Sequence, residues 1–417
     1  MSKAFIAGVG MTRLGKFPDR SVKDLVREAV TLALQDAGVS LADVQCAWFA
    51  NARQGQMEGQ NSIRGQCALR SMGWQAAPII NVENACAGGS TAFNQAMTSI
   101  LAGQHEVVIA VGADKQYFPE RSEEMMRAFR GGIDVHRAKE FFDRLASLGS
   151  DVVPDSVEEM QFGSPGRSFF MDLYAGMARH HMSLFGTTQE QIAAVAAKNH
   201  GHSVHNDKAQ YRRQMSVGDV LQDPAIVWPL TRAMCSPVSD GAAAVVLFSD
   251  KARRAKGTTR AVGIRSSVIT TSTDREPADF DRHTGRIAAM QAYERAGVGP
   301  EDIGLAEVHD ATAYAEIVQS ENLGFCARGD GGPLAASGAT TLGGRIPINV
   351  SGGLVSKGHP IGATGIVMIH DVVRQLRGEA GSAQVANPRF AAVENGGGFW
   401  GVEEAATAVH IVGPLIK

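Results

Sequence analysis

A cysteine followed by two glycines lies where a predicted strand turns into a predicted helix. Cys86 follows "APIINV", which predicts a short buried strand, and precedes "STAFNQAMTSILAG", whose apolar residues recur at helical spacing. The unpaired N–H groups and the dipole of a helix N-terminus favour a thiolate and lower the pKa of a thiol. Gly88 and Gly89 leave room beside the sulfur for a substrate or another backbone. Cys86 is therefore either a reactive nucleophile or a small buried apolar residue, as free cysteines often are.

Two histidines lie in segments that could meet this sulfur. His359 belongs to "NVSGGLVSKGHPIGATGI", a glycine-rich segment ahead of an apolar helix. Its imidazole can accept the thiol proton and then donate a hydrogen bond to an oxyanion, or it simply packs under a turn. His309 and Asp310 end a predicted strand in "AEVHDATAYAEI". The imidazole of His309 can hold a water or a carbonyl oxygen while Asp310 fixes its tautomer, or the two residues are a strand-end pair without a role.

A third segment, "VENGGGFWG", places three successive glycines after a strand. Their backbone N–H groups can line an oxyanion hole. Glu394, just ahead of them, is either an acid/base group or a solvated acid.

The elements that must position these residues follow an α/β pattern. Short apolar runs such as "AFIAGVG", "CAWFAN", "VVIAVGA" and "AAAVVLF" predict strands, and residues 22–37 and 87–101 have helical spacing. Forty-seven glycines separate these runs. We therefore expect strands and helices to alternate along the chain.

The chain also resembles itself. "LQDAGVSLADVQCAWFAN" and "YERAGVGPEDIGLAEVHD" share their order of features, and each is followed by a strand ending in Asn-Val, at Asn81 and at Asn349. A glycine-rich turn, a helix and another apolar strand follow in both cases. We predict two related halves, residues 1–255 and 256–417, whose matching loops meet at one site. Residues from 115 to about 235 have no counterpart and predict an added subdomain beside it.

Composition excludes several classes of protein. The 417 residues are 44% apolar and 20% charged with a net charge of −3, which argues against disorder and against nucleic acid as a partner. No run is long enough for a membrane span, and the N-terminal apolar run is too short for a signal peptide. The odd number of scattered cysteines favours reduced thiols and a cytoplasmic location. These cysteines are Cys46, Cys67, Cys86, Cys235 and Cys326.

Other binding sites find little support. His200, His202 and His205 cluster in "NHGHSVH", but no carboxylate or cysteine completes a zinc set, and no metal is expected. No GxGxxG follows the first strand, so a dinucleotide site is not indicated. The basic run "DKARRAKGTTR" near residue 250 is a solvated linker between the halves, or it contacts a phosphate.

Four segments together resemble the thiolase superfamily over essentially the whole chain: "NACAGGSTA", "HDATAYAE", "NVSGGLVSKGHPIGATG" and "ENGGGFWG". "LTRAMCSPVSDGAAAVVLFSD" and the His-Asp pair are similar to the sterol carrier protein x-like branch. The resemblance implies two pseudo-symmetric five-stranded α/β halves in a layered αβαβα arrangement plus a loop subdomain. It also implies cleavage or formation of a 3-oxoacyl-CoA, with coenzyme A as substrate or product and no tightly bound cofactor.

The same resemblance implies a role for each matching residue. Cys86 attacks the keto carbonyl after His359 takes its proton, and His309 holds a water that stabilises the enolate. The backbone N–H groups of Cys86 and Gly396 form the oxyanion hole. Coenzyme A contacts the 115–235 insertion, and it also contacts Ser351 and Gly352.

The sequence departs from the family pattern at the second catalytic cysteine. Glu394 and Ala311 stand where thiolases place that thiol, and Thr312 stands where many have phenylalanine. Glu394 with a raised pKa could carry the α-carbon proton, another group such as a histidine of the insertion could do so, or the enzyme does not catalyse ordinary thiolysis. The changes favour a bulky or unusual acyl group.

The resemblance also bears on assembly. It implies a homodimer or a larger oligomer, and several similar proteins work with a small partner subunit that carries an OB-fold and a zinc ribbon. Two other functions stay open. One is an acyltransferase or retro-aldolase acting on another carbon–carbon bond, and the other is a non-catalytic acyl-CoA or lipid-binding protein.

Overall fold

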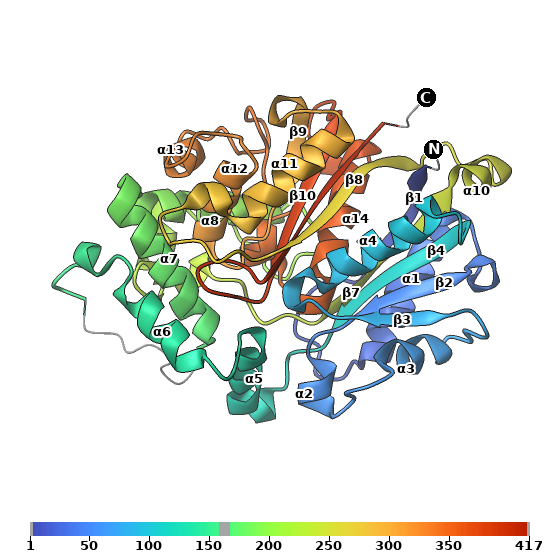
Figure 1. Cartoon of the computed structure of the whole chain (residues 1–417), viewed down its shortest axis with the longest axis horizontal. Helices are drawn as coiled ribbons and strands as arrows, with labels where there is room; N and C mark the ends of the chain where they lie inside the picture. Colours follow the sequence, from blue (N-terminus) through green and yellow to red (C-terminus); the bar gives the residue numbers. More distant parts are fainter. Residues whose placement is uncertain (1–2, 158–166, 415–417) are drawn as a thin grey trace.

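The computed structural model describes residues 3–157 and 167–414, which form an α/β fold (Figure 1). The described strands β3-β2-β4-β7-β1-β8-β11-β10-β9 form one continuous sheet in that order. The first half supplies β1 (Ala4–Met11), β2 (Cys46–Ala50), β3 (Ile79–Val82), β4 (Val107–Asp114) and β7 (Gly241–Ser249). The second half supplies β8 (Val262–Thr271), β9 (Ile303–Glu307), β10 (Phe390–Gly397) and β11 (Ala406–Gly413).

The two halves repeat the same pairing pattern. β2 pairs with β4 in parallel, as β9 does with β10, and β4 pairs with β7 antiparallel, as β10 does with β11. β1 and β8 are the last strands of the two patterns and pair with each other in the middle of the sheet. This repetition supports two related halves. Their exact boundary near residue 255 stays a prediction.

The second half has four described strands in the sheet where five were predicted, because the position next to β9 differs from its counterpart β3. There the chain makes a single parallel bridge between Ala306 and Ile348. Pro347 has no N–H to donate, and Asn349 has a φ of 53°, so the segment leaves the extended conformation at once. β3 itself is not the buried strand predicted: Ile80 is 42% exposed, because β3 is the edge of the sheet.

Helices form layers on either side of the sheet halves. α1 (Val22–Ala37) contacts β1 and β7, and α11 (Thr284–Ala296) contacts β8 and β11. α4 (Gly88–Leu101) and α14 (Thr364–Leu376) contact each other and lie between the two halves. The layers therefore follow the order helix, first half of the sheet, helix pair, second half of the sheet, helix. This is the predicted αβαβα arrangement (Figure 1).

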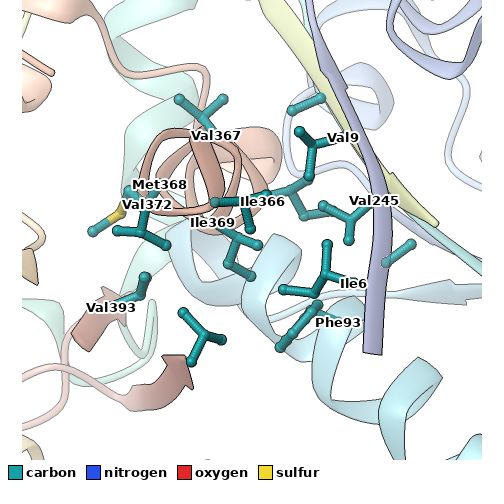
Figure 2. Packing of buried hydrophobic residues seen from close by; sticks show 14 of the residues in the cluster. Ile6, Val9, Phe93, Val245, Ile366, Val367, Met368, Ile369, Val372 and Val393 are labelled. Carbon is teal, nitrogen blue, oxygen red and sulfur yellow. The ribbon is translucent and has the colours of Figure 1, made fainter. Parts of the chain in front are cut away.

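The middle layer is the centre of the hydrophobic core. Ile366 and Ile369 of α14, Phe93 of α4, Ile6 of β1 and Val393 of β10 belong to one buried cluster (Figure 2). Each such side chain contributes about 1.5–3 kcal/mol when it leaves water. Because this cluster draws on both halves, it holds them in a fixed relation.

The predicted insertion is mainly helical, and its residues 158–166 lie outside the described part of the chain. It contains α5 (Ser122–Ala128), α6 (Ala138–Ser147), α7 (Phe169–Phe185), α8 (Gln189–Ser203) and α9 (Val217–Gln222), with the short strands β5 (Ala225–Val227) and β6 (Leu230–Thr231). The other helices are α2 (Gln54–Glu58), α3 (Arg64–Arg70), α10 (Asp250–Ala255), α12 (Ala313–Asn322) and α13 (Gly331–Ala336). Within residues 3–157 and 167–414, no helix has the length and apolarity needed to span a bilayer.

Candidate active site

A cavity of about 850 Å³ opens where loops of both halves meet the insertion. Cys86 of the first half, His309 and His359 of the second half, and Tyr174 of the insertion all line it. Aromatic and sulfur-containing side chains form much of the remaining wall, namely Phe129, Phe170, Phe399, Met126, Met171 and Met215. The cavity therefore combines a few polar groups with an apolar lining, as small-molecule sites commonly do.

Three of the predicted residues come together. The Cys86 sulfur and ring nitrogens of His309 and His359 lie within 4.8 Å of one another, and the two imidazole centroids are 5.1 Å apart. Cys86 lies in the short 3-10 turn Ala85–Ala87 immediately before α4. His359 lies in the loop that leads into α14.

Glycines let these two helix N-termini approach so closely. A Cβ at Gly89 would lie 3.0 Å from the carbonyl oxygen of Gly362. A Cβ at Gly365 would lie 2.6 Å from the backbone nitrogen of Ser90, a separation that real Cβ atoms essentially never have. Larger residues at these positions would move α4 and α14 apart, and with them Cys86 and His359.

A buried carboxylate ties the loops together. Asp114, at the end of β4, accepts backbone N–H bonds from Ala52 (3.3 Å), Arg53 (2.9 Å) and Gly362 (2.5 Å). Burial nevertheless raises the pKa of Asp114 to about 6, against the opposite effect of these bonds. Asp114 thus joins the loop after β2 to the loop that carries His359.

The hydrogen bonds of His359 fix its tautomer. Nδ1 lies 2.8 Å from the Thr364 hydroxyl, and that hydroxyl donates its one proton to the carbonyl oxygen of Pro360 at 3.0 Å. The Thr364 oxygen must therefore accept, so Nδ1 carries the proton and Nε2 keeps a free lone pair. Burial also lowers the pKa of His359 well below its usual value, and His309 and Arg53 lower it further. His359 is a neutral base.

His309 differs from the prediction in one respect. Neither of its ring nitrogens has a hydrogen-bond partner in the described part of the chain, and burial lowers its pKa to about 4. The prediction that Asp310 fixes its tautomer is wrong, because Asp310 accepts from Asn199 Nδ2 at 2.9 Å and from the Leu354 N–H at 2.6 Å. Both nitrogens of His309 are left for a water or a substrate oxygen.

The prediction of a lowered thiol pKa is also wrong. Burial raises the pKa of Cys86 to about 12, although Arg53 and the Gly398 backbone N–H, which donates to the sulfur, act in the other direction. The helix N-terminus is thus outweighed by desolvation. Cys86 and His359 together form a neutral thiol beside a neutral base.

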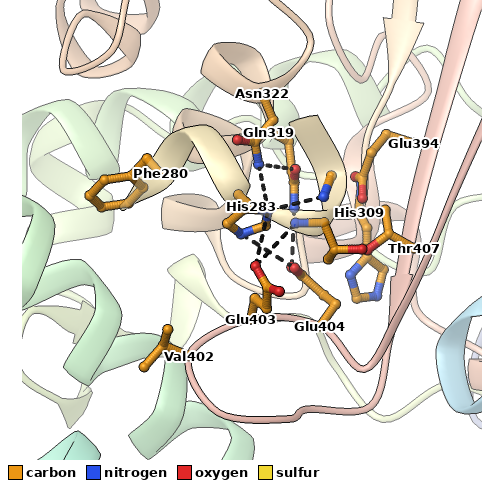
Figure 3. Close-up of polar contacts among 12 residues, drawn as sticks. Phe280, His283, His309, Gln319, Asn322, Glu394, Val402, Glu403, Glu404 and Thr407 are labelled. Carbon is orange, nitrogen blue, oxygen red and sulfur yellow. Dashed lines mark hydrogen bonds and ion pairs between the residues drawn. The ribbon is translucent and has the colours of Figure 1, made fainter. Parts of the chain in front are cut away.

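Glu394 lies behind His309 and does not line the cavity. Its Oε2 accepts the backbone N–H of His309 at 3.0 Å, while Oε1 has no partner among the described residues (Figure 3). Burial first, and then the neighbouring carboxyl of Glu404, raise the pKa of Glu394 well above its usual range. Glu404 is itself held by Gln319 at 3.1 Å. Glu404 lies ten residues from Glu394 along the chain but is close enough in space to raise its pKa.

The remaining predicted residues lie outside the cavity lining. Gly396 is paired with Thr407 in the sheet, and it is Gly398, two residues on, that reaches the cavity. Ser351 is occupied in a buried network, where its hydroxyl donates to Glu307 at 2.6 Å. Neither Ser351 nor its neighbour Gly352 is a lining residue, and their contact with coenzyme A stays a prediction.

The structure gives the histidine cluster separate partners. His200 Nε2 faces the Ala233 carbonyl, His202 Nδ1 the Asn349 carbonyl, and His205 Nδ1 the Ser382 hydroxyl. Among the described residues, the group spaced to hold a metal is instead Cys86, His309 and His359. We assign this group to cysteine–histidine chemistry, because a thiol beside an imidazole with a free lone pair is the arrangement that nucleophilic catalysis requires.

Sequence reasoning missed several residues that line the cavity. Tyr174 is 3% exposed, and no hydrogen bond of its hydroxyl is found among the described residues. Arg53 is likewise buried, whereas Arg212, Arg213 and Arg232 lie exposed at the cavity. All but Arg53 come from the insertion, which has no counterpart in the second half and so gave no repeat signal. The basic run near residue 250 does not line the cavity.

Comparison with known proteins agrees with this geometry. Residues 4–219 match the family model of the thiolase N-terminal domain, and residues 266–411 match the model described as thiolase C-terminal domain-like. The chain is 35% identical over 413 residues to an acetyl-CoA acetyltransferase of Methanothermobacter thermautotrophicus, covering 99% of each protein.

Two further relatives and one solved structure are similar over nearly the whole chain. Sterol carrier protein 2 of Oryctolagus cuniculus is 33% identical over 95% of this chain and 70% of its own length. The benzoylsuccinyl-CoA thiolase subunit BbsB of Thauera aromatica is 30% identical over 95% of each. The structure entitled "Ltp2-ChsH2(DUF35) aldolase" has a TM-score of 0.77 at 24% identity, covering 100% of this chain and 98% of that one, and shows the fold alone.

The Thr364 hydroxyl gives a first prediction. In Thr364→Val, Nδ1–H of His359 loses its acceptor, and we expect Cys86 to react with acyl-CoA about 10- to 100-fold more slowly. The Thr364→Ser variant keeps the hydroxyl and is the matched control. Rates come from intact-mass time courses, and equal rates in both variants would show that Thr364 does not orient His359.

The neutral pair gives a second prediction, for alkylation of Cys86 by iodoacetamide. Because burial raises the thiol pKa and lowers that of His359, the rate should keep rising from about pH 6 to about pH 9 without a plateau. Cys86→Ala identifies the contribution of the other cysteines in the mass spectrum. A plateau with a midpoint below about pH 7 would mean that a thiolate–imidazolium pair already exists before substrate binds.

Proposed function

The chain belongs to the thiolase family of acyltransferases, and we propose that it cleaves or forms a 3-oxoacyl-CoA through an acyl-enzyme on Cys86. The observation that carries this proposal is the meeting of the Cys86 sulfur with the ring nitrogens of His309 and His359 at the cavity. A nucleophile, a base with a free lone pair and an unpartnered imidazole are the groups that this chemistry requires.

In the cleavage direction, His359 Nε2 takes the Cys86 proton as the sulfur attacks the 3-oxo carbon. Because both groups start neutral, proton transfer and attack proceed together. The C2–C3 bond then breaks, leaving a thioester on Cys86 and the enolate of the departing acyl-CoA. His309, through a bound water, and protonated His359 stabilise the enolate oxygen.

In the second half-reaction, the thiol of coenzyme A loses its proton and attacks the acyl-enzyme. The shortened acyl-CoA leaves, and the Cys86 sulfur recovers its proton from His359. We propose the Cys86 backbone N–H as a donor to the tetrahedral oxyanion. The predicted second donor, Gly396, is paired with Thr407 in the sheet and does not line the cavity. The Gly398 N–H, which donates to the sulfur, is available to stabilise the thiolate as it leaves. Each such donor is typically worth about 3–4 kcal/mol.

The α-carbon needs a proton donor, and we propose Tyr174 for this role, with Glu394 as the alternative. Tyr174 lines the cavity, whereas Glu394 lies behind His309. Burial and the nearby Glu404 and Cys86 raise the pKa of Tyr174 well above its usual value, so the phenol stays protonated until an enolate forms. Its phenolate would then take the proton of the coenzyme A thiol, which returns the site to its starting state.

Coenzyme A enters this scheme as substrate and product, without a tightly bound cofactor. Arg212, Arg213 and Arg232 are exposed lining residues of the insertion, and we propose that they attract its phosphates. The five cysteines are free thiols, which fits a reducing compartment and the expected cytoplasmic location.

We also propose an oligomer. The β3 edge exposes backbone hydrogen-bonding groups and Ile80, so a second copy could pair with it. A small partner subunit is a further proposal, supported by two names: BbsB is called a subunit, and the structure with a TM-score of 0.77 is named for two components.

Mass analysis of the intact protein tests the acyl-enzyme. Mixed with a 3-oxoacyl-CoA or an acyl-CoA, the chain should gain one acyl group on Cys86, and free coenzyme A should remove it. Cys86→Ala should gain none. If no thioester labels Cys86, the retro-aldolase or the binding protein becomes the better account.

The proton donor is tested with Tyr174→Phe and Glu394→Gln, each of which removes one candidate acid. We expect Tyr174→Phe to lower turnover about 10²- to 10⁴-fold while Cys86 is still acylated by acyl-CoA. Glu394→Gln keeps an acceptor for the His309 N–H and should lower turnover less. The opposite ranking would transfer the role to Glu394.

A further inference from the structure

One arginine in the cavity differs from the others. Arg53, from the loop after β2, is 7% exposed and lines the cavity. Its Nη1 donates to Gln56 Oε1 at 3.0 Å and to the Ala128 carbonyl, and its guanidinium lies 4.1 Å from the centroid of the Phe129 ring. Among the described residues, Nε and Nη2 have no hydrogen-bond partner, and no carboxylate forms an ion pair with Arg53.

An unpaired buried charge is costly, so proteins rarely keep one without a use. The nearby acids are already engaged: Asp114 accepts three backbone N–H bonds, and the exposed Glu83 accepts the Ala85 N–H at 2.6 Å. Burial lowers the pKa of Arg53, but a guanidinium remains charged at neutral pH. The Arg53 guanidinium is therefore a buried positive charge at the cavity, and its free N–H groups can bind an anion.

The other arginines of the cavity have different surroundings. Arg167 pairs with Asp172 at 2.6 Å. Arg212, Arg213 and Arg232 are exposed, and Arg232 pairs with Asp223 at 2.9 Å. The phosphates of coenzyme A carry several negative charges and should bind to exposed arginines, because burying a diphosphate would cost far more free energy than burying one carboxylate. Arg53 is thus matched to a single charge within the apolar part of the cavity.

We propose that Arg53 binds a carboxylate on the acyl part of the substrate. The preferred 3-oxoacyl-CoA would then carry an acid group at the end of, or on a branch of, its acyl chain. Nε and Nη2 lie on one edge of the guanidinium and can hold both oxygens of a carboxylate. Phe129, Phe170 and Phe399 supply apolar wall for the carbons between the acid and the keto group. This proposal rests on the function proposed above.

The test compares two substrates in the unmodified enzyme. Both are 3-oxoacyl-CoAs with acyl chains of equal length, one ending in a carboxylate and the other in a methyl group. We expect kcat/KM for the acid to exceed that for the neutral chain by about 100-fold, the order of a buried charge-assisted contact. A ratio near one, or a preference for the neutral chain, would overturn the proposal.

Variants then assign the preference to one side chain. Arg53→Gln should remove most of the ratio by slowing the acid substrate, and Arg53→Lys should keep part of it. Arg64→Gln is the matched control, because Arg64 Nη1 donates to the Asn51 carbonyl at 2.7 Å in the same loop but does not line the cavity. In Arg64→Gln, the ratio of kcat/KM between the acid and neutral substrates should equal that of the unmodified enzyme. If Arg53→Gln slows both substrates equally, Arg53 does not recognise the carboxylate and only stabilises the loop.

Failure of this inference is distinguishable from failure of the proposed function. If the neutral substrate is thiolysed and Cys86 is acylated without any preference for the acid, only the role of Arg53 is lost. If neither substrate is turned over and no acyl group appears on Cys86, the acyl-enzyme itself is refuted.

Discussion

The close packing of two helix N-termini is the constraint on which the site depends. Gly89 of α4 and Gly365 of α14 let the two backbones approach within distances that a Cβ would forbid. Cys86 lies just before one helix and His359 just before the other, so this contact sets their separation. Asp114 adds the third connection by binding the loop after β2 and the Gly362 N–H together. The catalytic pair is thus a product of the interface between the halves.

Burial then decides the protonation states. It raises the pKa of Cys86 and lowers those of His309 and His359, so the resting site contains neutral groups. Glu394 behind His309 has a raised pKa as well. A site of this kind separates charge only when a substrate arrives, and fixed donors such as the Gly398 N–H are worth most in such a dry environment. Arg53 is the exception, a buried charge that is present before binding.

Much of the fold follows from sequence, because glycine punctuation and apolar periodicity are local signals. The helix predicted over residues 22–37 is α1, and the strand runs of the first half are β1, β2, β4 and β7. The meeting of Cys86, His309 and His359 was also predictable, from the repeat and from the family motifs. The exposed edge at Ile80 was not, because neighbouring strands are set by topology and not by local composition.

Residues whose role depends on distant partners escaped sequence reasoning. Asp310 looked like the partner of His309, yet Asn199 and Leu354, far apart in the chain, take its oxygens. Glu404 affects Glu394 because the connection between β10 and β11 brings it back beside the strand that carries Glu394. Arg53 and Tyr174 lie in segments without a motif, and their role becomes visible only from their position in the cavity lining. The protonation state of Cys86 likewise depends on the tertiary structure, since the effect of burial on its pKa outweighs that of the helix N-terminus.

In a crystal structure of Cys86→Ala with a 3-oxoacyl-CoA, loops of both halves must contact one substrate. We expect the 3-oxo carbon beside the Cβ of residue 86, with its oxygen facing the imidazoles and the nucleotide toward the exposed arginines. A ligand bound elsewhere, or one whose keto group is held away from both His309 and His359, would contradict it.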